Sequence, residues 1–404
     1  MGSPADDLAR WVPRLLAAWR RTRRAPPQRG PRPPEDRLQS DELREVAAAV
    51  ERLSLGLTRE RRLAGARYLD DEKLLGAYLL FYWPVSYLQA RGVLSELPRR
   101  PRAALDLGSG PGPVAFAALD AGAAEVLAAD RSARALAAAR SLATLAGEPL
   151  ATREWSPGRS SWKELSRGRA FDLVTLGHVV NELFLGEQAA ARRAAFLGEA
   201  LGLVAPGGSL VVIEPALRET SRSLLEVRDL LVAEGVSVRA PCLYRGPCPA
   251  LGKESDWCHA ERRVELPPLV AEIARRAGLR KEAVKMSYLV LAPRGEGWRP
   301  APPGRVFRIV SEPLPSKGRL RYMGCGPEGR VGLALQEKDR CGGNGAFEGL
   351  VRGDVVEVTG AEARGDGLRL GRESEVRVIA AAGRPLPGAS DPAAGRGPGS
   401  ALTP

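Results

Sequence analysis

The chain has 404 residues, of which 44% are hydrophobic and 27% charged, and this ordinary globular mixture is enough for two or three domains with a sizeable core. No stretch reaches the roughly 18 apolar residues that a membrane span requires, and the start lacks the apolar segment of a secretory signal, so neither a membrane-spanning nor a secreted protein is expected. Sixty Lys and Arg residues against 48 Asp and Glu give a net charge of +12, which favours a polyanionic partner such as nucleic acid, although a general compositional bias toward Arg would give the same excess.

A basic segment and a linker occupy residues 1–40. Eight arginines and no acid lie between residues 8 and 34, and Trp11 and Leu15 recur at helical spacing. The run APPQRGPRPP at 25–34 cannot hold a regular element. The segment is therefore expected either as a basic arm that lies on RNA or as a short amphipathic helix before a disordered linker.

Helical periodicity follows and then gives way to an alternation of strands and helices. Residues 41–100 place Leu43, Val46 and Val50 on one helical face, which predicts a helical pre-domain. Over residues 101–300, short β-type runs alternate with helical periodicity, which is the pattern of a doubly wound α/β domain with a parallel sheet. The strands expected in this sheet span residues 104–107, 126–130, 171–176, 209–214 and 287–292.

The remaining segments differ from this α/β pattern. Within the domain, residues 240–260 contain too many Pro and Gly residues for a helix and form a cysteine-bearing insertion. Residues 301–382 carry β-type runs separated by Gly-rich turns, which predicts a small β-barrel or sandwich. Residues 383–404 are too poor in apolar side chains to offset the entropy of ordering, so this tail is expected to be disordered.

The segment Asp106-Leu-Gly-Ser-Gly-Pro-Gly112 carries a ligand-binding signal. Gly108, Gly110 and Gly112 allow a strand to turn tightly into a helix and let the backbone approach a ligand that a Cβ atom would exclude. Asp130, at the end of the next expected strand, is placed to accept hydrogen bonds from ribose hydroxyls. Similar glycine spacing occurs in dinucleotide sites, but the order Leu-Asp-Leu-Gly-Ser-Gly-Pro-Gly is typical of class I methyltransferases. Asp106, the three glycines and Asp130 are therefore expected to bind S-adenosylmethionine.

The loop after the strand expected at 171–176 departs from a common catalytic pattern. Amino-group methyltransferases often carry Asn or Asp followed by Pro-Pro and an aromatic residue there, whereas this chain has Gly-His-Val-Val-Asn-Glu at residues 177–182. Asn181 and Glu182, together with His178, are candidates for orienting a substrate or moving a proton. Alternatively, they cap the next helix and line an otherwise empty pocket, so the catalytic residues stay open.

Three of the five cysteines gather in the insertion as Cys242-x5-Cys248-x9-Cys258, whereas Cys325 and Cys341 lie in the β region. Without a secretory signal, such clustering favours metal or redox chemistry over a disulfide framework. Four thiolates would complete a zinc site or an iron–sulfur cluster, and the spacing does not choose the metal. Two other interpretations are a Pro-Cys nucleophile of the kind found in cytosine-5 RNA methyltransferases and purely structural cysteines.

A combination of motifs carries a family resemblance that covers roughly residues 40–345. The motifs are Tyr68-Leu69 with Arg91, Leu105 to Gly112, Val179-Val180-Asn181-Glu182-Leu183, Glu214-Pro215, Ala240-Pro241-Cys242, Gly246-Pro247-Cys248-Pro249 and Trp257-Cys258-His259. Together they resemble the methyltransferase-like family of the small ribosomal subunit in mitochondria and bacteria, of the methyltransferase-like protein seventeen type. The cysteine segment is the most specific part of this resemblance.

The resemblance implies a metal centre and a ribosomal partner. A [4Fe-4S] cluster, with zinc as the alternative, would be held by Cys242, Cys248, Cys258 and Cys325. Cys341 is the rival fourth ligand, and His259 is expected to hydrogen-bond at the edge of the site rather than to bind metal. The implied partner is the small ribosomal subunit with its rRNA, during assembly or translation and without a membrane. The expected location is the bacterial cytoplasm, or the mitochondrion in a eukaryote.

Two functions that share the same RNA partner remain open. The favoured one is an assembly factor that holds S-adenosylmethionine and the cluster while the basic arm and the β domain grip rRNA phosphates. The alternative is an active rRNA methyltransferase, in which a nucleotide enters over Asn181 and methyl transfer depends mainly on positioning. A small-molecule methyltransferase is disfavoured by the basic charge and the added β domain.

Overall fold

The structure is a computed structural model that describes residues 4–23, 37–300 and 303–387. The linker expected at 25–34 lies outside the described residues, as does the expected tail from residue 388 onward. Among the described helices, none is both long enough and apolar enough to cross a membrane.

The chain separates into two compact units. The first comprises the described residues within Met1–Leu94 and Pro101–Arg299, and the second comprises those within Ser95–Arg100 and Pro300–Pro404. Each unit contains its own sheet and its own buried apolar side chains. The two units are therefore described separately.

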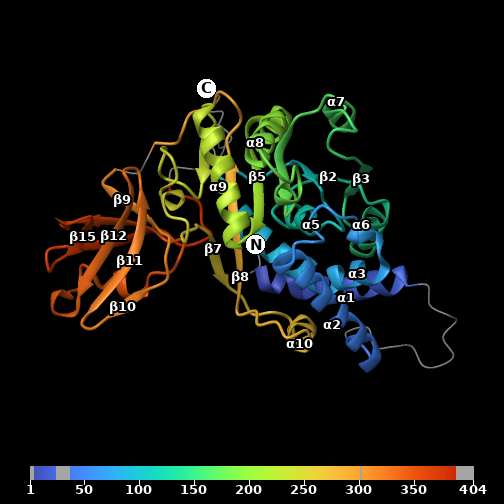
Figure 1. Ribbon diagram of the computed structural model, residues 1–404, viewed down its shortest axis with the longest axis horizontal. Coiled ribbons are helices and arrows are strands. Elements are labelled where there is room, and N and C mark those ends of the chain that lie inside the picture. Colours follow the sequence, from blue (N-terminus) through green and yellow to red (C-terminus); the bar gives the residue numbers. More distant parts are fainter. Residues whose placement is uncertain (1–3, 24–36, 301–302, 388–404) are drawn as a thin grey trace, which may run out of the picture. The chain divides into compact units, whose positions relative to one another are not determined.

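A mixed sheet forms the centre of the first unit (Figure 1). Its strand order is β3-β2-β1-β4-β5-β8-β6, and β7 pairs with β8. Strands β1 to β5 run parallel, whereas β8 is antiparallel to β5, β6 and β7. The strands are β1 (Ala103–Leu107), β2 (Glu125–Asp130), β3 (Leu150–Glu154), β4 (Phe171–Gly177), β5 (Val204–Pro215), β6 (Val238–Ala240), β7 (Ala260–Arg263) and β8 (Ala283–Leu291).

This topology confirms the predicted α/β class and corrects one detail of it. The sheet is mixed rather than purely parallel, because the chain returns along β8 in the opposite direction after the insertion. The first strand of the sheet, β1, lies in its centre. From β1 the chain continues outward on one side through β2 and β3, and it then crosses to the other side of β1 and continues outward through β4 and β5. The carboxyl ends of β1 and β4 therefore border the switch point, where ligands bind in open α/β sheets.

Helices cover both faces of this sheet (Figure 1). One face buries Leu105, Val174 and Leu210 against α8 and α9, while α4 and α5 contact strands from the other face. Helix α6 begins after Ser132, whose hydroxyl accepts the N–H of Ala135 over 3.2 Å. The helices that follow β1 are α5 (Pro113–Asp120), α6 (Ala133–Ala146), α7 (Trp162–Ser166), α8 (Ala189–Ala200), α9 (Arg218–Ala233) and α10 (Pro268–Arg276), with short turns η4 (Val180–Glu182), η5 (Leu201–Leu203) and η6 (Pro249–Gly252).

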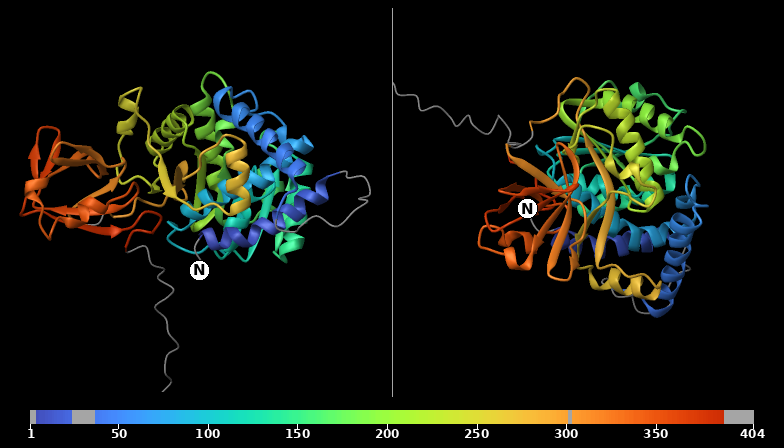
Figure 2. Two further views of the ribbon diagram at one scale, coloured as in Figure 1. Left: turned by 90° about the horizontal axis from the view of Figure 1, so that it is seen from below. Right: turned by 60° about the vertical axis from the view of Figure 1, so that its left-hand side comes forward.

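The N-terminal helices belong to the core of the first unit. Trp11 of α1 is 1% exposed and its indole N–H donates to Asp120 over 2.9 Å, while Arg91 of α4 pairs with Asp7 at 2.7 Å. The buried apolar face of α1 is that of an amphipathic helix, which is one of the two interpretations of residues 1–40 given by the sequence. Figure 2 shows α10 beside α2. These elements are α1 (Pro4–Thr22), α2 (Ser40–Ser54), η1 (Leu55–Arg59), η2 (Tyr68–Asp70), α3 (Glu72–Ala77), η3 (Tyr78–Tyr82) and α4 (Trp83–Leu94).

The second unit is a β-structure with the strand order β14-β15-β12-β11-β9-β13-β16, and β10 pairs with β11. Its core is built from side chains such as Phe307, Tyr322 and Leu333. The short segment Ser95–Arg100 also belongs to this unit, although the chain before and after it belongs to the first unit. An ion pair of 3.2 Å between Glu96 of this segment and Arg308 of β9 stabilises its position. The elements are β9 (Arg305–Ile309), β10 (Leu314–Ser316), β11 (Arg319–Gly326), β12 (Gly329–Gln336), η7 (Glu337–Asp339), η8 (Gly345–Gly349), β13 (Val355–Thr359), β14 (Glu362–Arg364), β15 (Gly367–Leu370) and β16 (Glu375–Ala380).

Candidate functional site

A pocket opens at the switch point of the first unit, beside the carboxyl ends of β1, β2 and β4. Its cavity of about 260 Å³ far exceeds the roughly 10–15 Å³ that one water molecule needs, so it has room for a ligand of many atoms. Four segments line it: residues 65–69 with Tyr78, the glycine loop with 130–132, the stretch 155–157 after β3, and residues 177–179 and 182–184 at and after the end of β4.

The glycine loop forms one wall of the pocket. Gly108 and Gly110 line the cavity and have φ values of 68° and 55°, a left-handed conformation that favours glycine. A Cβ atom on Gly108 would lie 2.4 Å from a methyl group of Val179, so a side chain there would displace the opposite wall. Gly112 does not line the cavity and instead begins α5.

Asp106 lies beneath this loop and does not line the cavity. Its carboxylate accepts hydrogen bonds from the hydroxyls of Ser109 and Thr175, each over 2.6 Å. Burial raises the pKa of Asp106 to about 6, and the two hydroxyl donors oppose that rise. The residue therefore positions the loop from behind.

Asp130 ends β2 and does line the cavity. One carboxylate oxygen accepts the N–H of Gly110 over 2.8 Å and the other accepts the N–H of Ser132 over 2.7 Å. Burial raises the pKa of Asp130, and these backbone donors counteract the rise. Because each carboxylate oxygen can accept a second hydrogen bond, the fixed group is still able to receive ligand hydroxyls.

The loop after β4 carries His178, Asn181 and Glu182, the three residues predicted as candidates for substrate chemistry. His178 and Glu182 line the cavity, whereas Asn181 does not. The imidazole Nε2 of His178 lies 2.8 Å from Oε1 of Gln89, and burial lowers the pKa of His178 to about 4, so the ring is neutral at pH 7. Glu182 accepts the N–H of Gly65 over 3.2 Å, and burial raises the pKa of Glu182 to about 7.

Asn181 is held by two other side chains. Arg61 donates to its side-chain oxygen over 2.7 Å, and its amide group donates to Glu214. Glu214 also accepts the N–H of Val180 over 2.8 Å, and burial raises the pKa of Glu214 to about 8. The sequence marks Glu214 as the end of a strand and as part of the Glu214-Pro215 motif, and its part in fixing this loop is seen first in the structure.

Residues 61–70 form a segment, called the strap below, that contributes one side of the pocket lining. This role of the segment was not predicted from the sequence. The Arg131 guanidinium donates to the carbonyls of Gly65 and Ala66 over 2.9 and 2.6 Å. Asp70 accepts the hydroxyl of Ser132 over 2.6 Å, and Tyr68 lines the cavity with its pKa raised by burial. The Tyr68-Leu69 motif is the one sequence signal that falls on this strap.

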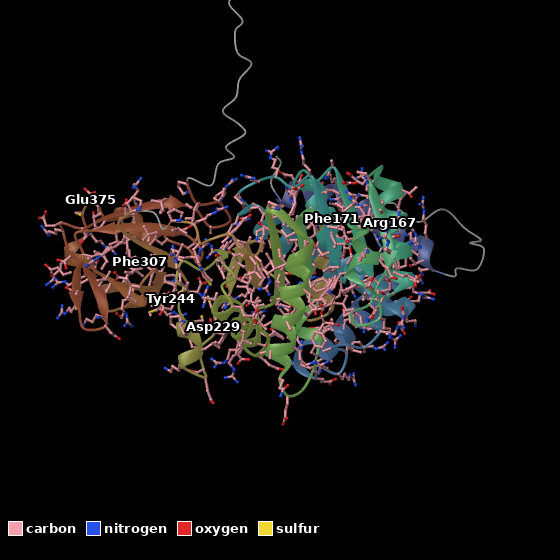
Figure 3. The ribbon with its side chains drawn as sticks, turned by 90° about the horizontal axis from the view of Figure 1, so that it is seen from above. Arg167, Phe171, Asp229, Tyr244, Phe307 and Glu375 are labelled. Atoms are coloured by element: carbon pink, nitrogen blue, oxygen red, sulfur yellow. The ribbon has the colours of Figure 1, made fainter. Side chains whose placement is uncertain are left out.

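The cysteine insertion is fastened to α9 by hydrogen bonds. Arg228 donates to the carbonyls of Tyr244 and Gly246, and Asp229 accepts the N–H of Cys248 over 2.8 Å (Figure 3). Arg222 adds three carbonyl contacts between 2.8 and 3.1 Å farther along the insertion. Two arginines on one helix therefore shape a segment without regular secondary structure over most of its length.

The thiols of the insertion interact electrostatically. Burial raises the pKa of the Cys248 thiol to about 12, and the charges of Cys242 and Cys258 add to that rise. Cys325 lies on β11, while the Cys341 thiol donates to the carbonyl of Arg372 over 3.2 Å. Within residues 4–23, 37–300 and 303–387, no group of three or more His, Cys, Asp or Glu side chains is arranged to hold a metal ion. The predicted iron–sulfur or zinc site is therefore not shown by the fold.

Comparisons with known proteins bear on the family of this chain. A family model described as mitochondrial small ribosomal subunit Rsm22 matches residues 75–358. No curated protein matches the chain.

Solved structures similar to the chain include several methyltransferases. A ribosomal protein L11 methylase from Lactobacillus delbrueckii subsp. bulgaricus is 16% identical over 52% of this chain and 77% of its own, with a TM-score of 0.30. An O-methyltransferase family protein from Burkholderia thailandensis is 18% identical over 64% of this chain and 74% of its own, with a TM-score of 0.35. A methyltransferase from Pyrococcus furiosus is 14% identical over 51% of this chain and 81% of its own, with a TM-score of 0.34.

Proposed function

The chain belongs to the family described as mitochondrial small ribosomal subunit Rsm22, and on that premise we propose that it is a methyltransferase-like protein that binds S-adenosylmethionine and acts with the small ribosomal subunit and its rRNA. The pocket where Gly108, Gly110 and Asp130 meet carries the cofactor part of this proposal. Family membership carries the ribosomal part. Calorimetry with S-adenosylmethionine tests the first, and co-sedimentation with isolated small subunits tests the second.

The pocket residues fit S-adenosylmethionine, which supplies a methyl group carried on a sulfonium. Asp130 is buried, fixed by two backbone donors and open to the cavity, so it can accept ribose hydroxyls. Gly108 and Gly110 leave the space that backbone approach requires. Asp106 and Gly112 serve as positioning residues, because the carboxylate holds the loop and the glycine begins α5.

An assembly role is the favoured form of this function. Its support is the placement of Asn181, whose side chain is engaged by Arg61 and Glu214 and does not line the cavity. The amide that would hold a target base is thus occupied within the protein. Small subunits from cells lacking this protein are expected to accumulate as precursors, and a variant that cannot bind S-adenosylmethionine should restore the mature particles at least in part.

Active rRNA methylation is the second candidate, and Glu182 supports it. A carboxyl group whose pKa lies near 7 inside the pocket is suited to exchanging a proton at neutral pH. Transfer of labelled methyl groups to rRNA of isolated small subunits tests this candidate directly. Labelling of a small metabolite in a cell extract, with no labelling of rRNA, would instead support a small-molecule methyltransferase.

The iron–sulfur cluster belongs to this proposal as a further part. Cys242, Cys248, Cys258 and Cys325 would hold it, with Cys341 as the alternative to Cys325 and zinc as the alternative metal. Family membership and the three cysteines of the insertion support it. A bound cluster would make the stability of this part of the protein sensitive to redox state and to iron. Anaerobically purified protein should contain about four irons and four sulfides per chain. Comparison of Cys325→Ser with Cys341→Ser by iron content identifies the fourth ligand.

The cellular location follows the same premise. The family description names the mitochondrial small subunit, which favours the mitochondrion over the bacterial cytoplasm as the place of action. Fractionation of the source cells tests this choice, since the protein should sediment with small ribosomal subunits of that compartment.

A further inference from the structure

The second unit has the topology of an OB-fold barrel. Strands β9, β11 and β12 form an antiparallel meander, β13 returns beside β9, and β15 runs parallel to β12. Strand β16 follows β15 after residues 371–374 and pairs with β13, so β15 and β16 act as one bent fifth strand that closes the ring. OB-folds bind oligonucleotides on the face of their second and third strands, between the loop joining strands one and two and the loop joining strands four and five.

The strands that form the corresponding face of this barrel carry basic side chains and no acidic side chains. Strands β11, β12 and β15 contain four arginines and no Asp or Glu. Along β11 the burial alternates, with Tyr322 in the core and Arg319 and Arg321 exposed. The arginines of β11 therefore point away from the core on the face that OB-folds use.

The middle of this face is flat. Across the sheet, Arg321 pairs in register with Ala334, and Ala334 pairs with Arg369. A Cβ atom added to Gly332 would meet only the Met323 sulfur, at 4.0 Å. Ala334 thus lies between two arginines, and Gly332 lies two residues along the same strand, which leaves space for a polymer backbone to pass.

Basic and acidic side chains both lie at the ends of this face. The loop before β11 and the end of β12 line a surface hollow that contains Lys317, Arg319 and Lys338 together with one acid, Glu337. The β14–β15 hairpin, which follows the fourth barrel strand, carries exposed Arg364 and exposed Asp366. A further acid, Asp339, is neutralised by Arg369 at 2.9 Å, so basic side chains remain in excess on this face.

On the opposite wall of the barrel, formed by β13 and β16, an exposed arginine is paired with an acid. There Glu357 of β13 pairs with Arg377 of β16 at 2.6 Å. Arg319, Arg321 and Arg364, in contrast, have no ion pair among the described residues of the chain. Exposed charges without a partner are available to a polyanion.

We propose that this face, defined by Lys317, Arg319, Arg321, Lys338 and Arg364, binds the sugar–phosphate backbone of single-stranded RNA. The choice of RNA rather than DNA rests on the proposed function. The aromatic side chains Tyr322 and Phe307, the latter labelled in Figure 3, are buried in the barrel core, so they are not available for base stacking on this face. Binding is therefore expected to depend on salt and only weakly on base sequence.

The test uses the full chain and a labelled single-stranded oligoribonucleotide of about 12 nucleotides, a length within the range that OB-folds cover. The triple variant Arg319→Gln, Arg321→Gln, Arg364→Gln is expected to weaken binding at least tenfold. The slope of log affinity against log salt should fall by about 2, because each phosphate contact on a single strand contributes about 0.7. The matched control Arg305→Gln, Arg340→Gln, Arg377→Gln removes three exposed arginines elsewhere on the same unit and should change affinity less than threefold.

Calorimetry with S-adenosylmethionine on all three proteins reports the state of the first unit, and thermal melting reports the folding of the second. Equal RNA affinity in the wild type and the triple variant, an equal loss in the control, or no binding by the wild type would overturn the assignment of this face. Failure of the proposed function would appear separately, as a wild-type chain that neither binds S-adenosylmethionine nor sediments with small subunits.

Discussion

The two walls of the proposed cofactor pocket are held in place by different means. The glycine-loop wall relies on the backbone, since the N–H groups of Gly108 and Ser109 both donate to the Ala129 carbonyl, over 2.8 and 3.0 Å. Its one buried carboxylate behind the loop, Asp106, bonds to Ser109 and to Thr175 on the adjacent strand. This wall is built almost entirely from a short sequence motif and the strands beside it.

The opposite wall depends on side chains that are distant in sequence. Arg61 and Glu214 hold Asn181, and Gln89 contacts His178. Burial shifts the pKa of His178, Glu182 and Glu214 in this wall, as it also does for Asp106 and Asp130 beside the glycine loop. The comparison teaches that one wall is a fixed cradle built from neighbouring residues, while the other, the responsive wall, depends on single ionisable and polar side chains that are far apart in sequence.

The strongest test of the fixed cradle is Asp130→Ala. Loss of the carboxylate removes the acceptor for ribose and leaves the Gly110 and Ser132 N–H groups without their partner, so affinity for S-adenosylmethionine should fall more than 100-fold. Calorimetry measures this change. Glu154→Ala is the matched control, because Glu154 ends the adjacent strand in register with Asp130 but is exposed and does not line the cavity. Unchanged affinity in Asp130→Ala would refute the ribose assignment.

The fixed cradle could be predicted from the sequence because the interactions that form it join residues that are close together in the sequence. The motif from Asp106 to Gly112 and the position of Asp130 need only one strand, one turn and the next strand to be interpreted. The strap at 61–70 and the contact between Asn181 and Glu214 could not be predicted, because they join segments far apart in sequence through side chains of common types.

The fold follows the same rule. Apolar runs made the strands near 104–107 and 171–176 recognisable, whereas β3 (Leu150–Glu154) has no fully buried residue along its length and gave no comparable signal. For α1 the sequence left two interpretations open, a basic arm and an amphipathic helix, because its arginines and its apolar spacing point to different roles; in the structure its apolar face is buried. In the barrel, Arg and Gly interrupt the apolar alternation of β11, so the sequence predicts a β region there but does not mark the bounds of this strand.

The responsive wall is expected to show its largest effect at Glu214. Since burial raises the pKa of Glu214 from its ordinary 4.5 to about 8, the folded state favours the neutral form, and stability present below pH 4.5 is lost as pH rises through 8. The free energy of unfolding of the wild type should therefore decline relative to Glu214→Gln between pH 5 and 8.5, by on the order of a few kcal/mol. Denaturant titration measures this difference. Glu234→Gln, a change at the surface end of α9, should leave the pH profile of the wild type intact.

A smaller effect is expected at Glu182, inside the cavity. As pH rises from 6 to 8 its carboxyl group ionises around its pKa of about 7, and the negative charge should favour a cationic sulfonium by up to about tenfold in affinity. Glu182→Gln should bind S-adenosylmethionine with no such rise. S-adenosylhomocysteine, whose sulfur is uncharged, is the control ligand and should show a flat profile with both proteins. A rise of the same size in Glu182→Gln would mean that another group causes it.

The smallest effect is expected where the responsive wall meets the cradle, at Arg131. Its guanidinium joins β2 to the strap through the carbonyls of Gly65 and Ala66, but the side chain is exposed, so water can replace these bonds at little cost. Arg131→Gln should therefore speed the release of S-adenosylmethionine about threefold in stopped-flow displacement, with little change in thermal stability. Arg134→Gln removes a nearby arginine whose contact with Glu72 is 3.9 Å long, and its release rate should match the wild type. Equal release rates in Arg131→Gln and Arg134→Gln would show that the strap does not retain the ligand, and the division between a fixed and a responsive wall would then rest on the buried carboxyl groups alone.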